Sequence, residues 1–169
     1  TVELIRSGAI GSVERVHVWF AKPGGWRRYQ PLTDRPTDAP PVPEGLDWDR
    51  WIGPAPMRPY HPCYHPHDWH YWWDFGNGEM GNMAPHFLDL VFWSLGLDAP
   101  ESIETVGPPV HPDSTPFWLD CTWRFPARGE LPPVEVTWYD GRGCPPAVKE
   151  LAGPVWDAGV LFVGQKGML

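Results

Sequence analysis

Residues 80–95 read MGNMAPHFLDLVFWSL, and this stretch decides the fold because its apolar side chains recur at the spacing of one helix face. The apolar positions are Met83, Phe87, Leu88, Val91, Phe92 and Leu95. Gly96 follows at once, and glycine directly after such a run is a common way to end a helix. The stretch therefore predicts the main helix of the molecule.

The same helix carries a second set of side chains, which is polar and aromatic. Asn82, His86, Asp89 and Trp93 recur every three or four residues and so share one face. An imidazole suits proton transfer to or from a substrate hydroxyl, and a nearby carboxylate or amide can orient it. The alternative is a surface histidine that pairs with Asp89. Spacing alone leaves both interpretations open.

A glycine pattern precedes this helix. Gly76, Gly78 and Gly81 match GxGxxG, the phosphate-binding loop of dinucleotide-binding folds. That loop normally follows a buried strand inside a βαβ unit, whereas residues 70–75 read HYWWDF, with no run of Val or Ile. We therefore expect the glycines to let the chain turn tightly into the helix, and we expect no NAD or NADP binding by this chain.

The rest of the pattern predicts an α+β fold. Residues 2–7 are expected to end a helix before Gly8, and Asp47 is expected to cap a short helical turn at 47–51. Alternating apolar residues, separated by Pro and Gly, predict an open, predominantly antiparallel β-sheet with helices packed on one face. The expected strands are 13–20, 102–106, 117–125, 134–139 and 160–163.

The strand at 117–125 presents its side chains alternately to two faces. We expect its apolar set to face the helices: Phe117, Leu119, Cys121, Trp123 and Phe125. Its mixed set, with Trp118 at the centre, is expected to be exposed as a candidate interface. Val134, Val136 and Trp138 of the next strand are expected to contribute to the same interface. An exposed sheet face tends to pair with its copy, so the sequence predicts a homo-oligomer.

Residues 23–75 are expected to form one long excursion rich in Pro, Trp and His. Its prolines prevent a long helix or a central strand. Interleaved aromatic side chains favour a packed segment, which we expect to wrap the domain. These aromatic residues are Trp26, Tyr29, Trp48, Trp51, Tyr60 and Tyr64.

Two groups inside the excursion could bind a ligand. Trp72 and Asp74 place a flat ring beside a carboxylate, which suits a sugar, although core packing explains such rings equally well. Imidazole is a common zinc ligand, and four histidines lie near Cys63 and Asp68: His61, His65, His67 and His70. Neither HExxH nor a paired Cys/His spacing is present, so structural histidines are favoured and zinc is the alternative.

Composition narrows the classes of function. A length of 169 residues fits one domain, and a net charge of -8 with 13 Lys plus Arg argues against a nucleic-acid partner. No apolar run approaches the roughly 20 residues that a membrane helix needs. The 3 cysteines are widely spaced and form no disulfide framework. We expect a single cytoplasmic domain over residues 1–169, incomplete at both ends, with no membrane partner.

Several stretches together resemble a known enzyme family. Residues 46–56 and 72–89 look like the second domain of the Gfo/Idh/MocA oxidoreductases, most strongly its Trp-rich bacterial branch. Residues 4–13, 138–141 and 162–167 are similar to further parts of that domain. The resemblance implies a substrate domain that, in full-length members, is attached to an N-terminal Rossmann domain. Neither that domain nor the family's Glu-Lys-Pro motif is present in this chain.

The resemblance also implies residue roles. The family's catalytic histidine matches His86, which would act as general acid and base on the substrate hydroxyl. Asn82 stands where the family has an aspartate, and an amide can orient the histidine but cannot accept its proton. Asp89 matches the acidic position that follows the catalytic histidine in the family. We group Asp89 with Trp72, Asp74 and Trp93 as candidate substrate-binding residues.

The implied activity is NAD(P)-dependent oxidation or reduction of a sugar, cyclitol or related polyol. NAD or NADP is expected for a full-length relative, whereas this chain alone is expected to be inactive in hydride transfer. The alternative is a noncatalytic carbohydrate-binding or oligomerisation module, and a zinc-binding protein is third.

Overall fold

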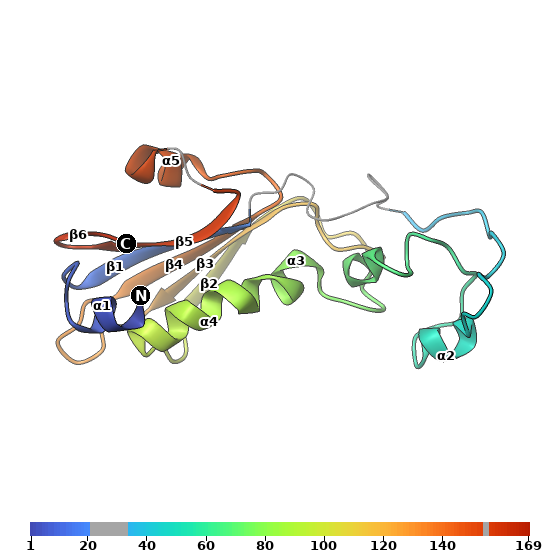
Figure 1. Ribbon diagram of the computed structural model, residues 1–169, viewed down its shortest axis with the longest axis horizontal. Coiled ribbons are helices and arrows are strands. Elements are labelled where there is room, and N and C mark those ends of the chain that lie inside the picture. The colour runs from blue at the N-terminus through green and yellow to red at the C-terminus, as the bar shows by residue number, and fades with distance from the viewer. Residues whose placement is uncertain (21–33, 154–155) are drawn as a thin grey trace.

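The computed structural model describes residues 1–20, 34–153 and 156–169. Six strands form one open sheet in the order β2-β3-β4-β1-β5-β6 (Figure 1). They are β1 (Val13–Phe20), β2 (Ser102–Val106), β3 (Leu119–Phe125), β4 (Val134–Asp140), β5 (Ala158–Gly164) and β6 (Gly167–Met168). All neighbouring pairs are antiparallel except β1 and β4, which are parallel. The expected α+β class and open sheet are confirmed.

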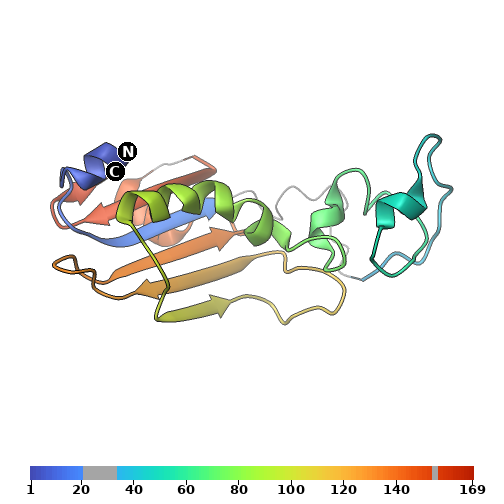
Figure 2. The same cartoon turned by 90° about the horizontal axis from the view of Figure 1, so that it is seen from below.

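The helices are short apart from one. They are α1 (Val2–Arg6), α2 (Trp48–Ile52), the 3-10 helix η1 (Asp68–Tyr71), α3 (Gly78–Asn82), α4 (Ala84–Leu95) and α5 (Pro146–Ala152). Helix α4 lies along one face of the sheet (Figure 2), and α5 lies over the opposite face (Figure 1). No helix in the described ranges is both long enough and apolar enough to span a bilayer.

The predicted helix at 80–95 is divided in two. Helix α3 ends at Asn82, and α4 starts at Ala84 with a proline in its first turn. Pro85 has no N–H and cannot donate to a carbonyl of the preceding turn, so one continuous helix is disfavoured there. Gly96 ends α4 in the left-handed conformation at φ 60°, as its position in the sequence predicts.

The main core lies between α4 and the sheet. Val91 of α4 is fully buried, and the Phe87 ring lies 6.2 Å from Trp138 and 6.3 Å from Phe20, measured between ring centroids. The sheet contributes inward side chains from its four central strands: Val16, Val18, Cys121, Phe125, Val134, Val136, Trp138 and Phe162. These contacts fix which side of α4 faces the solvent.

The structure confirms one assignment of sheet faces and corrects another. Cys121 and Phe125 face α4, as expected for the apolar set of β3. The expectation that Val134, Val136 and Trp138 help form the exposed face is wrong. The register pairs Cys121 with Trp138 and Trp123 with Val136, and paired residues share one face, so this set is also buried against α4.

The opposite face of the sheet is covered only in part among the described residues. Val148 of α5 packs on Trp19 and Leu161. Beyond α5 this face is polar: the hydroxyl oxygens of Thr122 and Thr137 are 3.0 Å apart, and Arg124 pairs with carboxylates of both neighbouring strands. We call this surface, formed by Glu104, Thr122, Arg124, Glu135 and Thr137, the polar sheet face.

The expectation that the excursion wraps the domain is wrong for its described part. Its described part, residues 34–75, extends away from one end of the sheet (Figures 1 and 2) and has a core of its own. That core is aromatic: Trp48, Ile52, Tyr60, Cys63, Tyr64 and Trp72. Rings packed on one another bury the apolar surface of this segment apart from the sheet. Trp26 and Tyr29 lie outside the described residues.

Backbone hydrogen bonds join the excursion to the loop between β2 and β3. The amide of Thr115 donates to Tyr71 at 2.8 Å, and the amide of Trp73 donates to Asp113 at 3.1 Å. Trp72 and Ser114 form an isolated bridge beside them. These bonds hold the end of η1 against the loop between β2 and β3.

Because Trp138 fills the space between α4 and the sheet, Trp138→Ala should lower the free energy of unfolding by about 3–5 kcal/mol. The matched control is Trp156→Ala, since Trp156 is 87% exposed and its replacement should change stability by less than about 0.5 kcal/mol. Urea denaturation measures both. Equal effects of the two replacements would contradict the core described above.

Candidate active site

The polar stripe predicted from sequence lies on the outer side of the helix pair. Asn82, His86, Asp89 and Trp93 are all exposed, and Trp93 is 61% exposed. They face solvent because Val91 and Ala84, on the other side of α4, are buried against the sheet. Asn82 ends α3, and the other three residues belong to α4.

The imidazole of His86 is open to a ligand. Among the hydrogen bonds and ion pairs that join described residues, none links His86 to Asp89, so the surface-pair interpretation has no support in the geometry. A neutral imidazole has one nitrogen that accepts a proton and one that donates. An exposed histidine beside an exposed amide and carboxylate can therefore bind a hydroxyl and exchange its proton.

The glycines before the stripe serve close packing. A side chain at Gly76 would collide with the backbone of His70, and one at Gly81 would collide with Asn77. Gly78 has φ 68°, and a Cβ there would lie 2.9 Å from Thr115. The preceding element is η1, a 3-10 helix. The loop therefore differs from a dinucleotide-binding loop in the element that precedes it, since such a loop follows a buried strand.

A buried polar cluster, which sequence reasoning missed, lies behind the start of α3. Glu79 is 6% exposed and accepts a hydrogen bond from the Tyr71 hydroxyl. His70 is also buried, with its Nε2 atom 4.0 Å from Glu79 Oε1. Burial lowers the pKa of His70, so the neutral imidazole is favoured there.

Asp140, at the end of β4, adds a second buried carboxyl. It accepts hydrogen bonds from the Leu119 amide at 3.1 Å and the Trp138 indole at 2.9 Å. Burial raises the pKa of Asp140 to about 7 despite these bonds, and the charge of Glu79 acts in the same direction. The sequence signals only the turn that follows Asp140, through the Asp-Gly pair at 140–141, and Gly141 has φ 75°.

Two other predicted substrate-binding residues lie in the excursion, apart from the stripe. Trp72 is 2% exposed and donates its indole N–H to the Cys63 carbonyl at 3.0 Å. Asp74 forms ion pairs with Arg58 and Arg35. Both side chains therefore have structural partners, and their role in binding a substrate stays a prediction.

The four clustered histidines also have individual partners. The ring of His61 accepts from the Cys63 amide at 3.1 Å, and His65 packs edge-on against Trp51. His67 lies 2.6 Å from Asp68, and His70 lies 3.1 Å from the His67 carbonyl. In the described part of the chain, no three His, Cys, Asp or Glu side chains converge as a metal site would require.

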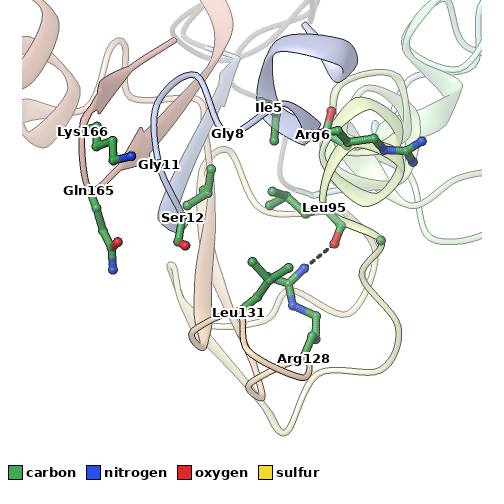
Figure 3. Close-up of a pocket in the computed structure, with 13 residues that line it drawn as sticks. Ile5, Arg6, Gly8, Gly11, Ser12, Leu95, Arg128, Leu131, Gln165 and Lys166 are labelled. Carbon is green, nitrogen blue, oxygen red and sulfur yellow. Dashed lines mark hydrogen bonds between the residues drawn. The ribbon is translucent and has the colours of Figure 1, made fainter.

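A cavity of about 530 Å³ lies at the far end of α4 (Figure 3). It is lined by the last turn of this helix at Ser94 and Leu95 and by loops from the same end of the sheet. His86 is eight residues upstream of Ser94, or about 12 Å along a helix. This cavity is therefore separate from His86, although Trp93 of the stripe adjoins it through Arg6.

An open, mostly antiparallel sheet backed by a histidine-bearing helix defines an α+β domain distinct from the βαβ folds that bind dinucleotides. The family model described as "Oxidoreductase family, C-terminal alpha/beta domain" matches residues 2–130, well over half of the chain. The chain belongs to the Gfo/Idh/MocA oxidoreductase family and represents its C-terminal domain. A comparison with curated proteins found no match.

The Asp140 carboxyl should make stability depend on pH. Its pKa rises on folding from 3.8 to about 7, so between these values the folded state keeps a proton that the unfolded chain loses. Its contribution to stability is full below pH 4 and falls as pH rises toward 7. The free energy of unfolding, wild type minus Asp140→Asn, should thus fall by up to about 4 kcal/mol across this range.

Denaturation at several pH values measures this difference. The change of this difference with pH is the informative quantity. Asp140→Asn also loses one hydrogen bond, but that loss is the same at every pH. A difference that stays constant from pH 4 to pH 7 would contradict the burial of an ionisable carboxyl at this position.

Proposed function

We propose that this chain is the substrate-binding domain of an NAD(P)-dependent oxidoreductase that acts on a sugar, a cyclitol or a related polyol. The observation that carries the proposal is the exposed His86, which core packing of α4 holds on the solvent face beside Asn82 and Asp89. Membership of an oxidoreductase family supports the same conclusion.

The proton step uses the stripe itself. The unprotonated nitrogen of His86 accepts the proton of a substrate hydroxyl during oxidation and returns it during reduction. The Asn82 amide has a donor and an acceptor, so it can bind a neighbouring hydroxyl but cannot take the proton. The Asp89 carboxylate accepts from a further hydroxyl, and the exposed Trp93 ring offers a flat apolar surface to a sugar face.

The nucleotide would be bound outside these 169 residues. The glycines at 76–81 follow a 3-10 helix and not a buried strand, which supports assigning NAD(P) binding to a separate Rossmann domain. The chain alone should therefore bind a polyol and exchange its hydroxyl protons without transferring hydride.

The alternative function, a noncatalytic module, is favoured by a different observation. The polar sheet face is uncovered over β2, β3 and β4 among the described residues, and Arg124 pairs there with both Glu104 and Glu135. An uncovered sheet face can meet the same face of a second copy, which supports a homo-oligomer. Association is compatible with catalysis, so the two proposals are tested separately.

Amide NMR of the chain during titration with glucose, myo-inositol and sorbitol tests the substrate proposal. At least one of these polyols should perturb the signals of Asn82, His86 and Asp89. His86→Asn should weaken that binding because the imidazole is lost, whereas the control His65→Asn, in the excursion, should not. Perturbation by none of the three polyols, or perturbation confined to α5, would refute the proposed site.

Light scattering tests the association. The chain should have at least the mass of a dimer, and Thr122→Lys should shift it to a monomer because association would bury a long charged side chain in the middle of the polar sheet face. Thr105→Lys is the control, since Thr105 is paired with Cys121 and belongs to the other face. A monomeric wild type, or equal behaviour of the two variants, would exclude this interface.

A further inference from the structure

The cavity at the far end of α4 combines apolar walls with basic side chains. It measures about 530 Å³, a volume typical of small-molecule sites. The apolar lining comes from Ile5, Val13, Leu95 and Leu131. The charged lining residues are Arg6, Arg128 and Lys166, and no Asp or Glu is among the described residues that line the cavity. This local positive charge stands out in a chain of net charge -8.

Backbone hydrogen bonds fix the loop that carries Lys166. The amide of Gln165 donates to the Ser12 carbonyl at 3.1 Å, and the amide of Lys166 donates to the Ile10 carbonyl at 2.8 Å. Gly11 permits this close approach, because it has φ 73° and a Cβ there would lie 3.1 Å from Lys166. The loop from α1 to β1 and the turn from β5 to β6 thus form one rigid wall.

The opposite wall carries Arg128. Two reciprocal backbone bonds of 3.1 Å join Arg128 and Leu131 in the turn between β3 and β4. The Arg128 guanidinium donates from Nη1 to the Leu95 carbonyl at the end of α4 (Figure 3). Its buried Nε atom has no hydrogen-bond partner among the described residues. A buried guanidinium donor without a partner is costly, and an anion would satisfy it.

Ser94 supplies a second unsatisfied group. It is 4% exposed, lines the cavity, and its hydroxyl has no hydrogen-bond partner within the described ranges. By contrast, Arg6 and Gln165 are already engaged. The Arg6 guanidinium donates to the Trp93 carbonyl at 2.6 Å and points away from the cavity in Figure 3, and the Gln165 amide donates to Glu14 at 2.9 Å.

We propose that this cavity binds a small organic anion, with its phosphate or carboxylate group at the Arg128 guanidinium and its apolar body against Ile5 and Leu131. Arg128 and the Ser94 hydroxyl recognise the charged group, and Lys166, which lies across Gly11 and Ser12 from Arg128 (Figure 3), adds positive charge at longer range. This site is independent of His86 and of the proposed function.

Calorimetry with phenyl phosphate and benzoate as probes tests the site. At least one should bind with a Kd on the order of 1 mM, a reasonable value for so small a ligand, and the tighter of the two identifies the charged group. Binding should weaken in added salt, since it depends on charge. Benzyl alcohol, which has the apolar ring without the charge, should not bind.

Variants locate the binding. Arg128→Gln should weaken it about tenfold, the usual effect of losing a charge-assisted hydrogen bond. Because Arg128 also bonds the end of α4, Lys166→Gln provides a second variant that removes charge from an exposed side chain without a side-chain hydrogen bond to other described residues. It should also weaken binding. The control Arg50→Gln, in α2, should bind like wild type.

Three results would overturn the proposal. The first is the absence of saturable binding by both anions. The second is equal binding of benzyl alcohol. The third is unchanged affinity in a correctly folded Lys166→Gln protein whose Arg128→Gln counterpart also binds normally.

Discussion

The packing of α4 against the sheet is the constraint on which the rest of the structure depends. Val91 and Phe87 fit among Trp138, Phe20 and the central valines, so only one side of α4 can face solvent. That side carries His86. The apolar face of α4 therefore contributes to the stability of the domain and also sets the position of its candidate catalytic group. This explains how a surface histidine is held in place without a side-chain partner among the described residues.

Much of the fold was predictable because periodicity is a local property. The strand at 13–20 has the expected bounds, and the expected segments at 134–139 and 160–163 agree with β4 and β5 to within two residues. The parallel pairing of β1 with β4 was not predictable, because the sequence of a strand does not specify which distant strand it pairs with. The break at Asn82 was missed although Pro85 signalled it, because the apolar spacing continues through the break.

The candidate site was likewise predictable in some of its residues and not in others. The stripe on α4 follows from helical spacing, and the structure places it on the solvent face as one group. The buried carboxyls Glu79 and Asp140 were missed because burial depends on contacts between a loop, a helix start and a strand end. Trp72 was predicted to bind substrate from its flat ring beside Asp74, and the structure places it in an aromatic core, a packing partner that the local sequence does not reveal.

The central claim is that His86 is the group on this domain that exchanges the substrate proton. Its most direct test is kcat in a protein that joins this chain to a Rossmann domain of the same family. His86→Gln should lower kcat for polyol oxidation by about 10²–10⁴-fold, the usual contribution of general acid and base catalysis, while His67→Gln leaves it unchanged. A His86→Gln protein with the kcat of wild type would contradict the account.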